Sequence, residues 1–224
     1  MLQLELAVTI DAGVPFVQAT YRLEGDGPLA LSCYEELDKL LQGIQIAHFP
    51  NVARIAALLS QGQAHLAQQY TQYAASCVKP GFDYIQSKCS GDLKAAVAAF
   101  KAARLFDAHR IVDLQPDANA VDSVTAFPFL NSSEILGNLK AELPQYLAHA
   151  TDISQQTESV DWWKQNSPDL PHWSNAACQV LLVQPSSATA ERVFSLLNSS
   201  FSADCQDSSL QDYIETSLML QFNR

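Results

Sequence analysis

Apolar side chains recur at three- and four-residue intervals through most of the chain, which is the spacing that gathers them on one face of an α-helix. The segments with this pattern are 29–45, 52–66, 92–103, 133–147, 172–183 and 210–220. Residues 1–10 are rich in apolar side chains but have an ambiguous period, no segment makes a convincing sheet, and no internal repeat is visible. We therefore expect a mainly α fold without a sheet.

Proline and glycine are expected to interrupt these helices, because proline lacks a backbone donor and clashes with the preceding turn. Gly13 and Pro15 divide the apolar N-terminal stretch, and Lys79-Pro80-Gly81 breaks the chain farther on. Pro144 should kink or split the helix that contains it. Asp92, which follows Gly91, is a residue type that commonly caps a helix start, so we expect it to begin the next helix.

A polar stretch at 151–159, rich in Ser, Thr and Gln, indicates a linker between two regions. We place a helical region at 1–155 and a C-terminal region at 156–224. Trp162 and Trp163 open the second region. Adjacent residues on a helix point about 100° apart, so we expect one indole in the core and the other partly exposed or at an interface. Tryptophan is enriched at protein interfaces, and both roles, core packing and partner contact, stay open.

Composition limits the choice of function. The 224 residues are 48% hydrophobic, enough for a substantial core, and the formal net charge is −11. Binding to a nucleic-acid backbone requires clustered Lys and Arg, so this chain alone is not expected to be the main DNA contact. The densest basic cluster consists of Lys94, Lys101, Arg104 and Arg110.

Common catalytic and metal-binding patterns are missing from the sequence. No two of the five cysteines stand two to four residues apart, so zinc ligation has little support. The chain contains neither Gly-x-Ser-x-Gly nor a phosphate-binding glycine loop. No apolar run approaches the length of a membrane span, and no signal peptide opens the chain. These features favour a reducing intracellular compartment.

One segment is more informative than the rest. Pro185-Ser-Ser-Ala-Thr-Ala-Glu-Arg-Val-Phe-Ser195 resembles the signature near the C-terminus of hAT-superfamily transposases. On a helical wheel, Glu191 lies at the edge of the apolar stripe of this segment, where a boundary glutamate in an ordinary amphipathic helix is the commoner interpretation. The other segments that resemble the family are 161–164 and 212–220 in the C-terminal region, and 19–27, 101–106 and 127–131, which resemble the helical insertion region of one hAT lineage.

The resemblance implies a fold and a metal site. It implies a helical insertion domain, followed by C-terminal helices that in the family complete a ribonuclease-H-like core. Glu191 matches the last carboxylate of an Asp-Asp-Glu site that holds two Mg²⁺ or Mn²⁺ ions for phosphoryl transfer. The family's two aspartates belong to strands before the insertion, and neither Asp11 nor Asp26 stands in a matching context. Glu191 is thus expected to be orphaned here, and the chain is expected to hold no cofactor and to be no enzyme.

The resemblance also implies a function and a location. It implies a dimerisation module of a truncated or domesticated transposase, whose partners are a second copy or related transposase chains, with DNA bound only in a full-length protein. The expected location is the nucleus, or otherwise the cytoplasm. The alternative is a fragment of an active transposase in which Glu191 works beside aspartates supplied elsewhere. The expected interface residues are Trp162, Trp163, Val193, Phe194, Tyr213 and Leu218.

Overall fold

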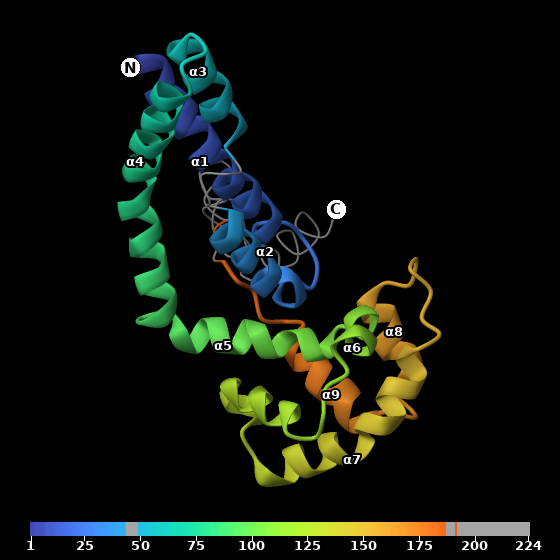
Figure 1. Cartoon of the computed structure of the whole chain (residues 1–224). Coiled ribbons are helices and arrows are strands. Elements are labelled where there is room, and N and C mark those ends of the chain that lie inside the picture. Colours follow the sequence, from blue (N-terminus) through green and yellow to red (C-terminus); the bar gives the residue numbers. More distant parts are fainter. Residues whose placement is uncertain (44–48, 187–190, 192–224) are drawn as a thin grey trace, which may run out of the picture. The chain divides into compact units, whose positions relative to one another are not determined.

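The computed structural model describes residues 1–43, 49–186 and 191 (Figure 1). Within these ranges the regular structure is entirely helical and contains no strand, which confirms the mainly α prediction. The ribonuclease-H-like core stays a prediction. Chain contacts divide the molecule into two compact units, Met1–Val183 and Gln184–Arg224, and nearly all described residues belong to the first. The division at 155/156 that the sequence predicts falls inside that first unit.

The first unit contains both α-helices and short 3₁₀ helices. In chain order they are α1 (Leu2–Leu23), α2 (Ala30–Gly43), α3 (Pro50–Ser60), α4 (Ala64–Ser90), α5 (Lys94–Ala103), η2 (Arg104–Phe106), α6 (Ala108–Leu114), η3 (Ala120–Ala126), η4 (Pro128–Leu130), α7 (Ser133–Ala150), α8 (Ser159–Asn166) and α9 (Pro171–Val180).

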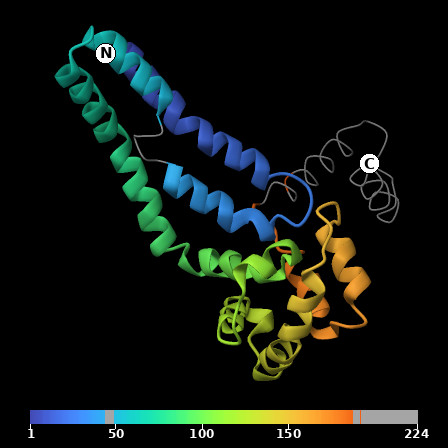
Figure 2. The same cartoon turned by 45° about the vertical axis from the view of Figure 1, so that its right-hand side comes forward.

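Two hydrophobic cores form within this unit. Helices α1, α3 and α4 lie side by side in both views and share the smaller core (Figures 1 and 2). Its buried residues are Leu4, Ala7, Val8, Phe49, Val52 and Ala74. The larger core is built from the first turn of α2 and from the elements between α5 and α9, and it holds all three tryptophans.

A buried carboxylate fixes α1 against α3. Asp11 accepts hydrogen bonds from the Asn51 side-chain amide at 2.6 Å and from the backbone amide of Val52 at 2.9 Å. Helix α3 begins with Pro50 and has no capping side chain of its own at Phe49. Asp11 therefore satisfies one of the free amides at the start of α3, and it has a structural role.

The expected breaks at Gly13–Pro15 and at 79–81 are wrong. Helix α1 continues through Pro15, α4 continues through Pro80, and α7 is not split at Pro144. An interior proline costs about 3 kcal/mol, and around Pro15 tertiary packing offsets this cost. Helix α1, for example, contacts α2, α3 and α4 along its length.

The cap expected at Asp92 is also wrong. Helix α5 begins at Lys94, with Leu93 in the capping position. The carboxylate of Asp92 instead pairs with Lys88 at 2.5 Å, one turn earlier in the chain.

Candidate functional site

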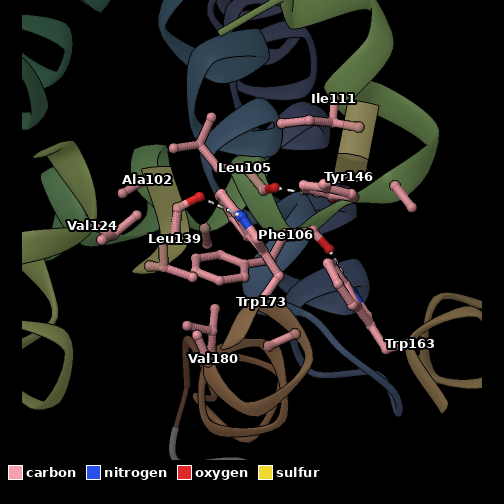
Figure 3. Close-up of a cluster of buried hydrophobic side chains, with 14 of the residues drawn as sticks. Ala102, Leu105, Phe106, Ile111, Val124, Leu139, Tyr146, Trp163, Trp173 and Val180 are labelled. Atoms are coloured by element: carbon pink, nitrogen blue, oxygen red, sulfur yellow. Dashed lines mark hydrogen bonds between the residues drawn. The ribbon is translucent and has the colours of Figure 1, made fainter. Parts of the chain in front are cut away.

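An aromatic cluster joins α7, α8 and α9 around Tyr146 (Figure 3). The centroid of the Tyr146 ring lies 4.9 Å from that of Trp163, 4.8 Å from that of Trp173 and 5.6 Å from that of Trp162. Phe106 of η2 adds a fifth ring, 5.2 Å from Trp173. All five side chains are buried, so the cluster is the centre of the larger core.

The polar atoms of this cluster reach backbone carbonyls that lie earlier in the chain. The Tyr146 hydroxyl donates to the Leu105 carbonyl at 3.1 Å, and the Trp163 indole nitrogen donates to the Phe106 carbonyl at 2.9 Å. The Trp173 indole nitrogen donates to the Leu139 carbonyl at 2.9 Å. A buried hydroxyl or indole N–H usually has such a partner, because leaving it unpaired is costly.

Burial, with a smaller contribution from the charge of Asp107, raises the pKa of Tyr146 well above its ordinary value of 10.0. Both effects disfavour the phenolate. The phenol therefore stays protonated and remains a donor.

A carboxylate from α7 caps the start of helix α9. Glu142 accepts hydrogen bonds from the backbone amides of His172 and Trp173, each at 3.1 Å to its Oε2 atom. Pro171 occupies the first position of α9, where its missing N–H costs nothing. A negative group at a helix start is also favoured by the helix dipole. Glu142 thus fixes the start of α9 and, with it, the position of the Trp173 side chain in the core.

Two histidines hold the connection between α7 and α8. The Nε2 atom of His109 lies 2.8 Å from the Thr157 carbonyl, and Nδ1 of His149 lies 2.9 Å from the Asn166 side-chain oxygen. Asp107 caps α6 by accepting from the backbone amide of His109 at 3.0 Å. The polar segment predicted as a linker is therefore attached to the core at Thr157.

Trp162 and Trp163 are both buried, so the expectation that one of them is partly exposed is wrong. Their rings meet edge to face at 4.8 Å. Helix α8 contacts α9 on one side and α6 on another, which covers two of its faces. Because two faces are covered, adjacent indoles that point about 100° apart can both be buried.

The basic cluster seen in the sequence is partly neutralised. Arg110 pairs with Glu35 of α2, and Arg104 lies 3.9 Å from the same carboxylate. The guanidinium of Arg104 also covers the Tyr34 ring at 4.6 Å, and the Lys101 ammonium lies 5.8 Å from that ring. These contacts attach α2 to η2 and α6, and two of the four cations are committed to Glu35.

Glu191, the carboxylate that matches the family's metal site, lies in a helical turn with its side chain exposed. Among the described residues, no group of three or more His, Cys, Asp or Glu is placed to hold a metal ion. The described part of the chain also contains no helix that is both long and apolar enough to cross a membrane. The expected interface residues Val193, Phe194, Tyr213 and Leu218 lie outside the described residues.

The described site is a helical scaffold whose buried aromatic centre has a structural role. Residues 142–223 match the model of the hAT family C-terminal dimerisation region. Residues 142–223 therefore confirm the C-terminal part of the resemblance found in the sequence, whereas the resemblance of 19–27, 101–106 and 127–131 to the insertion region stays a prediction. Neither the curated proteins nor the solved structures include a match to the chain.

Sequence reasoning missed the residues that organise this scaffold. Nothing in the local pattern singles out Glu142 as the cap of a helix that begins at Pro171. The acceptors at Leu105, Phe106 and Leu139 are backbone atoms, so no residue type identifies them. Pro171 itself was a usable signal, because proline is favoured in the first turn of a helix.

Proposed function

We propose that the chain is a protein dimerisation module of a truncated or domesticated hAT-type transposase, without catalysis of its own. The match of residues 142–223 to the family's dimerisation region carries this proposal. The partner is a second copy, in a two-fold symmetric dimer, or a related transposase chain. DNA is bound only within a full-length protein, and the nucleus is the expected location.

We propose that the buried aromatic cluster holds the surface residues of the dimer interface in fixed positions. Trp162 and Trp163 act indirectly, by stabilising the core beneath the interface, since both are buried and neither offers much surface to a partner. Within the described part of 142–223, two large apolar side chains are more than half exposed, Val160 on α8 and Leu182 just after α9. We propose that these two side chains face the partner, together with Val193, Phe194, Tyr213 and Leu218.

We propose that the chain has no catalytic activity because it lacks enough carboxylate ligands for a two-metal site. Two divalent ions in a phosphoryl-transfer site need several carboxylates, and Glu191 supplies one. The second candidate is a fragment of an active transposase, and the match of 185–195 to the family signature favours it. DNA cleavage that depends on Mg²⁺ or Mn²⁺ and disappears in Glu191→Ala would establish that second candidate.

Sedimentation of the whole chain tests the dimer. We expect a monomer–dimer equilibrium in the micromolar range, on the order of 1–100 μM. Leu182→Lys should shift the equilibrium toward monomer about tenfold or more, because it places a charge in an apolar contact. Leu93→Lys, at an exposed leucine outside 142–223, is the matched control and should leave it unchanged. A wild-type chain that stays monomeric throughout this range would contradict the proposal.

A further inference from the structure

A surface cavity of about 610 Å³ lies where α5 faces η3 and the end of α6. The small and apolar side chains that line it include Ala98, Ala102, Leu105, Leu114, Ala120 and Ala126. Four of these six are alanines, whose side chains end at Cβ and leave space between the facing elements. Ligand sites typically have volumes of roughly 300–1,000 Å³. The cavity is therefore large enough for one bulky apolar side chain and part of the backbone that carries it.

The polar side chains at this cavity are either cationic or already hydrogen-bonded. The hydroxyls of Ser123 and Thr125 donate to backbone carbonyls within η3, each at 2.7 Å. Lys101 and Arg104 supply positive charge, and none of the described residues that line the cavity is a carboxylate. A ligand that enters the cavity therefore meets apolar walls next to positive charge.

Helix α5 and η2 form a basic stretch on an acidic chain. Residues 94–106 contain three cations and no carboxylate, whereas the whole chain has a formal net charge of −11. Arg104 lies 3.9 Å from Glu35, but Lys94 and Lys101 are exposed and reach no carboxylate in the described part of the chain. These two lysines are seven residues apart, so they lie on one face of α5, about 10 Å from each other along its axis. Their charge is therefore available to an anionic partner.

We propose that this cavity, together with Lys94 and Lys101, is a docking site for an acidic peptide segment of another protein. The segment inserts one bulky apolar side chain between α5 and η3, and its flanking carboxylates face the two lysines. We call the cavity and these lysines the α5 site. An apolar anchor in a pocket supplies most of the affinity in such a contact, and complementary charges supply orientation and a faster encounter.

Two features favour a peptide over a nucleic acid at the α5 site. Nucleic-acid phosphates are bound by rows of Lys and Arg, whereas most of the side chains that line this cavity are apolar. A long polyanion is also repelled by a chain whose net charge is −11. A short peptide is affected mainly by charges within the screening length, about 8 Å at physiological ionic strength. The α5 site lies outside residues 142–223, so this inference does not depend on the proposed dimer.

Fluorescence polarisation with the full chain and a labelled peptide tests the proposal. The probe is a short synthetic peptide in which one leucine is flanked on both sides by glutamates. One control peptide has lysine in place of every glutamate, and the other has alanine in place of the leucine. We expect the probe to bind weakly, with a Kd on the order of 10–100 μM, because a single anchor buries less area than a standard interface. Each control peptide should bind about tenfold more weakly or not at all.

Two matched pairs of variants locate the binding site on the chain. Lys101→Glu reverses a charge beside the cavity and should weaken binding of the probe by about tenfold. Arg54→Glu makes the same reversal at an exposed position of α3 and should leave binding unchanged. Ala98→Leu narrows the cavity and should also weaken binding, whereas Ala96→Leu places the same side chain on the opposite face of α5 and should not. Matching circular dichroism spectra will show that each variant is folded.

The other outcomes overturn the proposal, and each has a distinct meaning. No binding of the probe at about 1 mM, or equal binding by the two members of either pair, removes the peptide site. A single-stranded oligonucleotide that binds more tightly than the probe, and loses binding in Lys101→Glu, assigns the site to nucleic acid. If the probe does not bind and Lys101→Glu shifts the chain toward monomer in sedimentation, the occupant is a second copy. The effect of Leu182→Lys on the dimer is measured separately, so the proposed function can stand when this inference fails.

Discussion

The indole nitrogen of Trp163 donates a hydrogen bond to the carbonyl of Phe106, 57 residues earlier in the chain. Tyr146 and Trp173 make equivalent bonds to Leu105 and Leu139. All three donors lie within the hAT dimerisation region at 142–223, and all three acceptors precede it. The core under this region is therefore completed by residues that the family match does not include.

A fragment of residues 142–224 should consequently fail to fold. Without the preceding residues, three donors lose their acceptors, at about 1–3 kcal/mol for each that stays buried. The rings also lose Phe106 and the other apolar side chains that cover them. Near-ultraviolet circular dichroism should show a fixed aromatic environment in the full chain and none in the fragment. A folded, dimeric fragment would show that the earlier residues are dispensable.

Substitutions inside the aromatic cluster should separate the hydrogen bond from the packing. Tyr146→Phe keeps the ring and removes the donor to Leu105, so it should lower the free energy of unfolding by about 1–3 kcal/mol. Trp173→Ala removes a fully buried indole and should cost about 3–5 kcal/mol. Urea denaturation measures both. Equal costs would mean that the buried Trp173 indole contributes no more to stability than the single hydrogen bond of Tyr146.

Acid should weaken the attachment of α1 to α2. The hydrogen bond from Lys39, and then that from Arg22, lowers the pKa of Glu36 below its ordinary value of 4.5, although burial opposes the shift. A carboxyl whose folded pKa is lowered contributes stability that is complete above about pH 4.5 and is lost as the pH falls through the folded value. Glu36→Gln should thus be less stable than the wild type at neutral pH.

This difference should shrink below pH 4.5 and vanish once Glu36 is protonated in both states. Urea denaturation at a series of pH values measures it. Glu134→Gln, at an exposed position of α7, serves as the control for removing a negative charge. A Glu36→Gln deficit that stays constant down to pH 2 would contradict the assignment.

Cysteine labelling should distinguish buried from exposed thiols. Burial, and then the charge of Glu35, raises the pKa of Cys33 to about 11. Because the thiolate is the reactive form, Cys33 should stay unmodified by maleimide in the folded chain. Cys77 and Cys178 are exposed and should react. Peptide mass spectrometry reads the modified positions, and rapid labelling of Cys33 would show that α2 opens readily.

The sequence predicted those parts of the fold that depend on local periodicity. The helices expected at 29–45 and 92–103 correspond to Ala30–Gly43 and Lys94–Ala103. It misjudged Pro15, because packing of α1 against α2, α3 and α4 outweighs the local cost of proline, and it also misjudged Pro80, which lies in an exposed part of α4. It also misjudged the two adjacent tryptophans, since periodicity shows which face a residue occupies and not how many faces are covered. The 185–195 signature identified the hAT region because the resemblance needs no tertiary contacts.

The division of the first unit into two cores has a consequence for partial unfolding. The smaller core, beneath α1, α3 and α4, has six buried apolar residues, whereas the larger one surrounds three tryptophans. Regions with fewer buried contacts open with a smaller free energy. Backbone amides of α1 and α3 should therefore exchange with deuterium through local opening while those of α7 and α9 remain protected. Helix α1 would then belong to the segment that opens first, so partial unfolding would leave the aromatic cluster of the larger core intact.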